Sequence, residues 1–325
     1  MSRIRAAVVG VGSFGRNHAR VINELEGVEL AAIVDTDKER AQSLGEQYRC
    51  SVYSDIEAII GAVDAAVVAS PTETHADLGR RLLESGIDVL IEKPIASTSD
   101  AGEQLTETAK HHGRILQVGH LERFNPAVLA LKQALTVPLF FEVHRLSVFT
   151  PRSLDIDVVL DLMIHDLDLV LNCVKELPAE VHAAGISVLS PKVDIANVRL
   201  VFPSGCIANL TASRVSTEQV RKLRLFQPGE YISVDYGRQD AVRLAVAPGQ
   251  EPPIRFEPLF VQKAEPLRLE IQSFFDCVRT RSHPLVDGYQ ATNALRVAES
   301  ILAKIAKHAE IVANTVRRVG QPALP

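Results

Sequence analysis

The feature that most constrains this chain is an apolar run near its amino terminus that ends in three glycines. The run covers Ile4 to Val9. A strand that turns through glycines directly into a helix points the first amide groups of that helix at a phosphate. Gly10 permits a tight turn, Gly12 lets the backbone approach a pyrophosphate, and Gly15 lets the helix pack against the strand. We therefore expect a dinucleotide to contact the whole turn, which comprises Gly10, Gly12, Ser13, Phe14 and Gly15.

An acidic residue stands where the second strand of such a unit would end. A helix-compatible segment from Arg16 to Leu25 leads to the apolar run Val28 to Val34, which stops at Asp35, twenty residues beyond the last glycine. A carboxylate at this point accepts hydrogen bonds from the adenosine ribose hydroxyls, and it repels a 2′-phosphate. Asp35 therefore favours NAD as the cofactor, while Lys38 and Arg40 leave NADP open.

Composition is that of an ordinary globular protein with room for two domains. The chain has 325 residues, of which 46% are hydrophobic and 23% charged, and its formal net charge is −5. This length can bury two cores, and the mild negative charge disfavours nucleic acid and anionic membranes as partners. No apolar run approaches the roughly 20 residues of a membrane-spanning helix, and the early first strand leaves no room for a signal peptide.

Cysteine usage points to a reducing compartment. The four cysteines are scattered, with no close pair: Cys50, Cys173, Cys206 and Cys277. Free thiols are therefore favoured over disulfides or a zinc site, and we expect a cytoplasmic protein.

Strand and helix patterns alternate in the first third of the chain. Such alternation predicts a parallel sheet with helices on both faces, and ligands of these sheets lie across the carboxyl ends of the strands. Strands are expected at Ala6–Val9, Glu29–Val34, Ala65–Ala69, Asp88–Ile91 and Ile115–Val118, and helices at Lys38–Gln47, Glu73–Glu84 and Ser99–His111.

The pattern changes after about Gly119. Strand-like runs dominate as far as Gln262, which predicts a mostly antiparallel sheet, and Pro203-Ser204-Gly205 between two of them predicts a hairpin. We therefore expect an α/β protein with an N-terminal Rossmann domain over residues 1–120 and a C-terminal α+β domain with an open sheet over residues 121–325. His120 to Asn125 is the expected hinge. Helices are expected at Pro126–Leu135, Val158–Val174, Leu267–Thr280 and Tyr289–His308, and a strand at Leu139–Val148.

A lysine follows one of the predicted parallel strands directly. Glu92-Lys93-Pro94 comes after an apolar run, so Lys93 would lie at the carboxyl end of a buried strand. Desolvation in a closed cleft lowers the pKa of such an amine, and its ammonium can polarise an alcohol or carbonyl oxygen. The alternative is a surface lysine paired with Glu92.

A second cluster of polar residues has helical spacing. Asp161 and His165 are one turn apart, and Asp157, Asp168 and Asn172 extend the same stripe. A carboxylate one turn from an imidazole can fix its tautomer and raise its basicity, as a general base requires. The same pattern also fits the solvated edge of an amphipathic helix, and two such ligands could hold a metal, although no third ligand is evident.

Other polar residues could line a cleft. Ser70, Thr72 and His75 lie in a strand-to-helix loop that would reach the nicotinamide end of a cofactor, although Thr72 equally suits the N-cap of the next helix. An anionic substrate needs fixed guanidinium donors, although most arginines are solvated surface residues. The candidates are Arg123, Arg145, Arg152 and Arg214.

These motifs together resemble one family of sugar dehydrogenases, the Gfo/Idh/MocA oxidoreductases. The resemblance rests on the glycine turn, on Ser70-Pro71-Thr72 with His75, on Glu92-Lys93-Pro94 and on Asp161 with His165, and it covers almost the whole chain. It implies that Lys93 and His165 are catalytic, that Asp161 supports His165, and that the open sheet serves substrate binding and subunit pairing in a homodimer or homotetramer.

Two segments resemble a bacterial branch of this family that acts on UDP-N-acetylglucosamine in making a lipid A built on a diamino sugar. They are Gly119–Pro126 and Val158–Asp166; Val158-Val159-Leu160 replaces the glycine-rich entry that is common in the family. The branch implies a sugar nucleotide as substrate, bound by Arg123, Arg152, Asp161 and His165. Two alternatives remain open, which are a dehydrogenase of a free sugar or inositol and a nucleotide-sensing protein without catalysis.

Overall fold

The computed structural model describes residues 3–150, 156–247, 249, 251 and 253–318, and these form two compact units. The first unit combines residues 1–124 with 264–292, and the second combines residues 125–263 with 293–325. Each unit is thus built from two separate stretches of chain. No helix among the described residues is both long enough and apolar enough to cross a bilayer.

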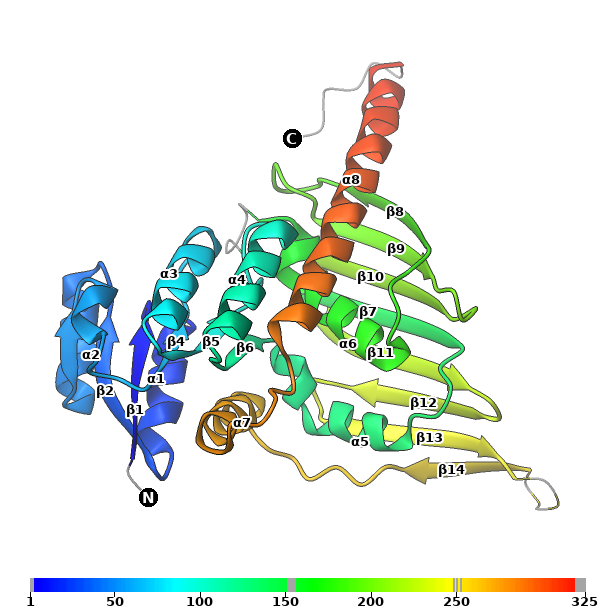
Figure 1. Cartoon of the computed structure of the whole chain (residues 1–325). Helices are drawn as coiled ribbons and strands as arrows, with labels where there is room; N and C mark the ends of the chain where they lie inside the picture. Colours follow the sequence, from blue (N-terminus) through cyan, green and yellow to red (C-terminus); the bar gives the residue numbers. More distant parts are fainter. Residues whose placement is uncertain (1–2, 151–155, 248, 250, 252, 319–325) are drawn as a thin grey trace. The chain divides into compact units, whose positions relative to one another are not determined.

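The first unit is a doubly wound α/β sheet (Figure 1). Six parallel strands follow the order β3-β2-β1-β4-β5-β6, so the strand order reverses between β1 and β4. Ligands of such sheets bind outside the carboxyl ends of the strands at this reversal. The strands are β1 (Ile4–Val9), β2 (Val28–Val34), β3 (Ser51–Tyr53), β4 (Ala65–Val68), β5 (Asp88–Glu92) and β6 (Leu116–Gly119).

Helices cover both faces of this sheet. The helices are α1 (Gly15–Glu24), α2 (Lys38–Tyr48), α3 (Thr72–Glu84), α4 (Ser99–His111) and α7 (Pro266–Thr280). Residues of α1, α2 and α7 share one apolar cluster with alternate residues of the strands, among them Leu90. The neighbouring Ile91 lies on the opposite side of β5, where α3 and α4 pack on each other beside Gly79.

The late segment of the first unit completes both its core and its edge. Ile271, Phe274 and Phe275 of α7 are fully buried in the cluster. Beyond this helix, the amide of Val118 in β6 donates to Val286 O at 3.1 Å, and Asp287 forms an antiparallel bridge with Gln117. Residues from near the end of the chain therefore pair with the outer strand of the first sheet.

The second unit is a mixed, mostly antiparallel sheet of eight strands (Figure 1). The order is β14-β13-β12-β11-β7-β10-β9-β8, and only β7 and β10 pair in parallel. The strands are β7 (Phe140–Val148), β8 (Glu180–Ile186), β9 (Ile195–Val201), β10 (Ile207–Ser216), β11 (Val220–Gln227), β12 (Glu230–Asp235), β13 (Asp240–Val246) and β14 (Ile254–Pro258).

The helices of this unit lie on one face of its sheet. They are α5 (Pro126–Ala134), α6 (Ile164–Val174) and most of α8 (Gly288–Arg318). The hairpin at Pro203-Ser204-Gly205 is confirmed, since β9 and β10 pair antiparallel around it and Gly205 has a φ of +86°. Only a residue without a Cβ adopts that angle without strain.

The expected fold class is confirmed. Most helices and strands have bounds close to the expected ones, and the helix Ser99–His111 is observed as expected. Two differences have physical causes. The short edge strand β3 has only three residues, too few for a periodic pattern. The division at residues 120 and 121 does not anticipate that α7 packs with the first unit, because apolar periodicity says nothing about which sheet a helix covers.

Candidate functional site

The predicted cofactor-binding residues of the first unit follow four neighbouring strands. Gly10 follows β1, Asp35 follows β2, Ser70 follows the end of β4, and Lys93 follows β5. Because these strands are parallel neighbours, their carboxyl ends meet at one edge of the sheet. Local sequence motifs from Gly10 to Lys93 are thereby brought together at the carboxyl ends of the strands.

The glycine turn has the backbone geometry that the sequence predicts. Gly10 has a φ of +85°, and an added Cβ would lie 2.8 Å from Ala69 O. A Cβ on Gly15 would lie 1.8 Å from Gly10 O, which no side chain tolerates. A Cβ on Gly12 would instead meet nothing within 4 Å. The fold itself thus requires glycine at positions 10 and 15, and Gly12 leaves open space where a ligand approaches.

The first turn of α1 is suited to an anion. Phe14 occupies the N-cap with no side-chain cap hydrogen bond, and the first turn holds no acidic residue. The initial amides of a helix carry a partial positive charge and need a partner. Ser13 and Phe14 are exposed beside them, so the turn residues remain accessible to a pyrophosphate.

Asp35 is fixed by three donors at the end of β2. Its Oδ2 accepts from the amide of Val11 at 2.7 Å, and its Oδ1 accepts from the amide of Asp37 at 2.8 Å and from Arg40 Nη2 at 2.9 Å. Burial opposes ionisation of this carboxyl, but Arg40 and the two amides outweigh burial and lower its pKa. Asp35 is therefore an ionised acceptor that is directly tied to the glycine turn.

Glu92 links the end of β5 to the helix after the glycine turn. His18 Nε2 donates to Glu92 Oε1 at 2.7 Å, and the amide of Lys93 donates to Glu92 Oε2 at 3.2 Å. Glu92 also packs against Gly119, where a Cβ would come within 3.0 Å of its Oε2. Burial opposes ionisation, but the contacts with His18 and Lys93 lower the pKa of Glu92. Glu92 thus accepts a hydrogen bond from the backbone of Lys93, in addition to its electrostatic interaction with Lys93.

A second carboxyl, Glu270 of α7, is buried near Glu92. Its side chain is 1% exposed, and neither carboxyl oxygen has a hydrogen-bond partner among the described residues. Burial and the negative charge of Glu92 raise the pKa of Glu270 well above its ordinary value. Burial and the charge of Glu92 thus favour the protonated form of Glu270, a residue that no motif in the sequence marks.

The loop between β4 and α3 brings Ser70, Thr72 and His75 together. Thr72 is the first residue of α3, and Pro71 holds the N-cap without a side-chain cap, so the alternative that Thr72 caps the helix is wrong. His75 is 1% exposed, and its ring nitrogens lie 2.8 Å from Pro94 O and 2.9 Å from Ser70 O. His75 therefore bridges the loop after β4 and the loop after β5.

Asp161 and His165 lie at the start of a buried helix in the second unit. Residues Val159–Met163 form one π-helical turn, closed by the amide of Ile164 on Val159 O, and α6 continues from Ile164. Asp161 is inside the π turn, and His165 is in the first turn of α6. Such turns occur frequently at functional sites. The periodicity of the sequence predicts an ordinary helix here and does not reveal this change of winding.

The alternative of a solvated helix edge does not hold for α6. Six consecutive residues from Asp166 to Leu171 are buried, and Asp168 is 2% exposed. Asp166 forms a bidentate ion pair with Arg145 of β7, with both nitrogen–oxygen distances at 2.8 Å. Asp157 precedes the π turn and accepts from the amide of Val193 at 2.9 Å. Asp166 and Asp168 are thus buried, and Asp157 contacts the protein backbone, so these acids do not form a solvated edge.

The candidate guanidinium groups have internal contacts. Arg123, 4% exposed, donates from Nη2 to Leu285 O at 2.8 Å and to Gln290 Oε1 at 3.1 Å. Arg214 contacts Ile156 O and Asp194. Arg152 lies outside the described residues. The partner of Arg145 is Asp166, so a structural ion pair accounts for this arginine.

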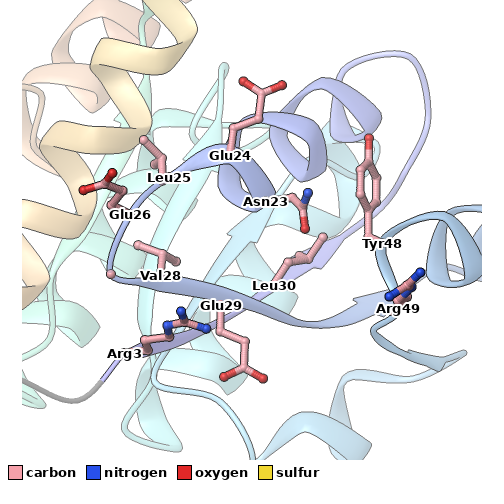
Figure 2. A pocket seen from close by; sticks show the side chains of 11 residues that line it. Arg3, Asn23, Glu24, Leu25, Glu26, Val28, Glu29, Leu30, Tyr48 and Arg49 are labelled. Carbon is pink, nitrogen blue, oxygen red and sulfur yellow. The ribbon is translucent and has the colours of Figure 1, made fainter.

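A cavity of about 410 Å³ lies beside the start of β2, away from the carboxyl ends of the strands. It is lined by the end of α1, the start of β2 and the end of α2, and Figure 2 shows Glu24, Glu29, Tyr48 and Arg49 among its side chains. Glu24 is already paired with Arg20 and Arg268. The cavity contains none of the predicted site residues, and the carboxyl ends of the strands remain the candidate site.

No group of three or more potential metal ligands occurs in the part of the chain that the structure describes. His18 and Glu270 are the site residues that sequence reasoning missed. His18 could have been found, because it is three residues after Gly15 on the face that packs against the sheet. Glu270 has no such signal, because its partner Glu92 lies in a distant part of the chain.

Comparisons with known proteins agree with both units. A model described as "Oxidoreductase family, NAD-binding Rossmann fold" matches residues 4–120, and one described as "GFO/IDH/MocA C-terminal domain" matches residues 141–226. The chain is 34% identical over 304 residues to a UDP-N-acetylglucosamine 3-dehydrogenase of Acidithiobacillus ferrooxidans, covering 92% of this chain and 96% of that protein.

A solved structure and one further relative extend this likeness. A solved structure of UDP-N-acetylglucosamine 3-dehydrogenase from Acidithiobacillus ferrooxidans superposes with a TM-score of 0.89 at 32% identity, covering 95% of this chain and 99% of that one. A scyllo-inositol 2-dehydrogenase (NAD+) of Bacillus subtilis is 26% identical over 318 residues, covering 91% and 92% of the two chains.

Proposed function

Since the chain belongs to the Gfo/Idh/MocA oxidoreductase family, we propose that it oxidises the 3-hydroxyl of UDP-N-acetylglucosamine to the 3-keto sugar nucleotide with NAD. The supporting observation is the meeting of the glycine turn, Asp35 and Lys93 at the carboxyl edge of the first sheet. The substrate follows from likeness to a UDP-N-acetylglucosamine 3-dehydrogenase over nearly the full length of both chains.

The residues at this edge fit a dinucleotide. Gly12 leaves space for the pyrophosphate, and the uncapped first turn of α1 offers amides to it. Asp35 is ionised and keeps a free lone pair on Oδ2 for the adenosine ribose, which favours NAD over NADP. Arg40 Nη2 donates to Asp35 Oδ1 at 2.9 Å. Ser70, Thr72, Glu92 and Lys93 belong to the nicotinamide end of the same edge.

Bound NAD supplies the hydride acceptor of the reaction. The side chains of this protein handle the proton and the charge on the substrate oxygen. His165 accepts the proton of the 3-hydroxyl, and Asp161, four residues earlier on the same helical segment, supports the imidazolium that results. Lys93 donates a hydrogen bond to the oxygen as negative charge develops on it. Arg123 and Arg152 are assigned to the anionic part of the substrate.

NADH formation tests this assignment directly. The purified protein is assayed by absorbance at the nicotinamide band with NAD or NADP and with UDP-N-acetylglucosamine as the substrate. We expect turnover with NAD, and the product should carry a ketone at carbon 3 by mass and NMR analysis. Turnover of UDP-N-acetylglucosamine at another carbon, or no turnover at all, would contradict the proposal.

A free cyclitol is the second candidate substrate, because inositol dehydrogenases are among the relatives. A cyclitol carries no diphosphate, so its binding requires no side chain that contacts one. Parallel assays with myo-inositol, scyllo-inositol and glucose separate the two candidates. The kcat/KM for the sugar nucleotide is expected to exceed that for each free polyol. A protein that binds NAD tightly but oxidises none of these compounds would instead be a nucleotide sensor.

The open face of the second sheet is proposed to bind a second copy of the chain. A row of apolar side chains crosses five adjacent strands on this face, with Phe140 beside Phe226, then Tyr231, Leu244 and Phe256. Phe256 is 65% exposed. An exposed patch of this kind is typical of subunit interfaces.

Sedimentation velocity tests this pairing. We expect the wild-type protein to be a homodimer or homotetramer, and the double variant Phe226→Glu/Phe256→Glu to dissociate. Ile60→Glu, at an exposed apolar residue of the first unit, is the control and should keep the wild-type assembly.

The scattered free cysteines support a cytoplasmic location for the reaction.

A further inference from the structure

His75 has an arrangement of hydrogen-bond partners that a neutral histidine cannot satisfy. Its Nδ1 lies 2.8 Å from Pro94 O and its Nε2 lies 2.9 Å from Ser70 O. A backbone carbonyl oxygen only accepts hydrogen bonds, and a neutral imidazole carries only one N–H. One of the two contacts would then set a nitrogen lone pair against an oxygen lone pair.

Rotating the ring does not remove this conflict. A half-turn about the Cβ–Cγ bond exchanges each nitrogen with a ring carbon, so that C–H groups would face both carbonyl oxygens at nearly the same distances. Contacts of C–H with oxygen are about 3.3–3.6 Å long between the heavy atoms. Both observed distances are clearly shorter. The two nitrogens therefore face the two carbonyls, and both must carry protons.

Burial makes the requirement strict. His75 is 1% exposed, so water cannot substitute for a missing donor, and an unsatisfied buried carbonyl costs free energy. With two protons, the ring makes two charge-assisted hydrogen bonds, which are stronger than neutral ones. His18 is an informative contrast, because only its Nε2 has a partner and that partner is the Glu92 carboxylate. One proton satisfies His18, whereas His75 needs two.

The two carbonyls belong to the two loops that form the nicotinamide end of the candidate site. Ser70 follows β4, and Pro94 directly follows Lys93 after β5. These strands are parallel neighbours, and the last residues that pair between them are Val68 and Ile91. His75 thus connects the loops just past the point where the strand hydrogen bonds stop. Fixing Pro94 on one side, while Glu92 is fixed by His18 on the other, restrains the backbone of Lys93 from both directions.

We propose that His75 is an imidazolium clamp that joins the Ser70 and Pro94 carbonyls and thereby positions Lys93 for catalysis. His75 is a positioning residue, because its ring nitrogens are committed to the protein backbone. The role in catalysis rests on the proposed function of Lys93, whereas the charge state of the ring does not.

The charged groups near the clamp come from a few elements. The loop after β4, Ala69-Ser70-Pro71, has none. Those on the elements that meet at or pack beside His75 are Glu73 and Asp77 on α3, Glu92 and Lys93 at the end of β5, and Asp100 and Glu103 in the first turns of α4. The carbonyls therefore provide the direct partners of the ring, and no carboxylate is hydrogen-bonded to it among the described residues.

Nitrogen-15 NMR of the histidine side chains tests the charge state in the cofactor-free protein. The chain is labelled at histidine alone, and the signals of His75 are identified by their loss in His75→Asn. An imidazolium shows two protonated nitrogens with similar shifts, whereas a neutral ring shows one protonated and one bare nitrogen that are far apart. We expect the first pattern for His75 at pH 7. A bare nitrogen on His75 overturns the proposal.

Kinetics of His75→Asn tests the positioning role. Asparagine offers a single amide nitrogen and cannot bridge both carbonyls. We expect kcat to fall roughly 10- to 100-fold, because a displacement of about 1 Å near the chemistry costs this much, while the KM for NAD changes less than about threefold. His111→Asn, at an exposed position on α4, is the matched control and should keep the wild-type kcat.

The outcomes distinguish the two proposals. An imidazolium signal in a protein that oxidises none of the tested sugars contradicts the proposed substrate but leaves the clamp standing. A neutral His75 in an active dehydrogenase contradicts the clamp alone. If His75→Asn folds, by its thermal transition, and keeps the wild-type kcat, the positioning role is wrong even where the ring is charged.

Discussion

His18 Nε2 lies 2.7 Å from Glu92 Oε1, so the helix that begins at the glycine turn is tied to the residue that precedes Lys93. This contact joins the nucleotide-binding part of the first unit to its candidate catalytic lysine. The His18 side chain is 1% exposed and that of Glu92 is 17% exposed, so loss of either partner leaves the other without a largely buried contact.

Replacing Lys93 or His165 by alanine should lower turnover and spare cofactor binding. Each group acts on the substrate oxygen in the proposed reaction, and proton transfer or charge stabilisation of this kind contributes about 10²- to 10⁴-fold in rate. We expect kcat to fall by that factor in each variant. Calorimetric titration should give a Kd for NAD within a few-fold of wild type. Wild-type turnover in either variant would remove that residue from the mechanism.

Asp35→Ala should weaken NAD binding. The carboxylate is proposed to accept from the adenosine ribose, and it also holds the amide of Val11 in the glycine turn. Loss of a charged hydrogen bond of about 1.5–3 kcal/mol corresponds to a Kd roughly 10- to 150-fold higher. Asp37→Ala is the control, because Asp37 caps α2 and contacts Arg40 but not the turn. Equal NAD affinity of Asp35→Ala and wild type would refute the ribose contact.

Glu270 should make the free energy of unfolding depend on pH. Its pKa is raised in the folded protein by burial and by the charge of Glu92, so its contribution is fully present below the unfolded pKa of about 4.3. That contribution is lost as pH rises through the folded pKa. Urea unfolding from pH 4 to 9 should therefore show a decline in the wild type that Glu270→Gln lacks. Glu310→Gln, on the exposed side of α8, should decline as the wild type does. Parallel curves for all three proteins would show that Glu270 is not the source.

The buried ion pair of Arg145 and Asp166 should be sensitive to the removal of one partner. Both side chains are at most 4% exposed, and either one alone leaves an uncompensated buried charge. Asp166→Leu and Arg145→Met should each lower the free energy of unfolding by about 3–5 kcal/mol. The double variant Arg145→Met/Asp166→Leu should be more stable than either single variant. A double variant that loses the sum of the two single effects would show that the residues act independently.

Local motifs allowed much of the first unit to be predicted, and the reasons are physical. Gly15 and Asp35 are constrained by contacts with Gly10 and Val11 within one strand–helix–strand unit, so their spacing carries the information. Glu92 could be placed at a strand end, but its contact with His18 and its proximity to Glu270 depend on how helices from distant parts of the chain pack. No periodic pattern records such packing.

The second unit shows the same limit at Asp161. The four-residue spacing to His165 predicts a shared helix face, yet the π turn at Val159–Met163 inserts an irregularity that side-chain patterns do not encode. The acid at position 166 has an equally hidden role, because its partner Arg145 lies on a strand of the sheet. The sequence pattern therefore groups these polar residues, while the structural contacts of Asp157 and Asp166 become visible only in the fold.

The late position of α7 bears on how this protein is made. Ile271, Phe274 and Phe275 complete a core whose strands have all been synthesised by residue 119, so the nascent first sheet must wait for the ribosome to deliver residues 264–292. At about 5–20 residues per second, the interval is roughly 7 to 35 seconds. During that time α1 and α2 alone cover this side of the sheet, and the surface that α7 buries and the outer strand β6 lack their late partners. Protection by a chaperone during translation is the expected requirement, and a genetic fragment that stops at residue 124 should aggregate.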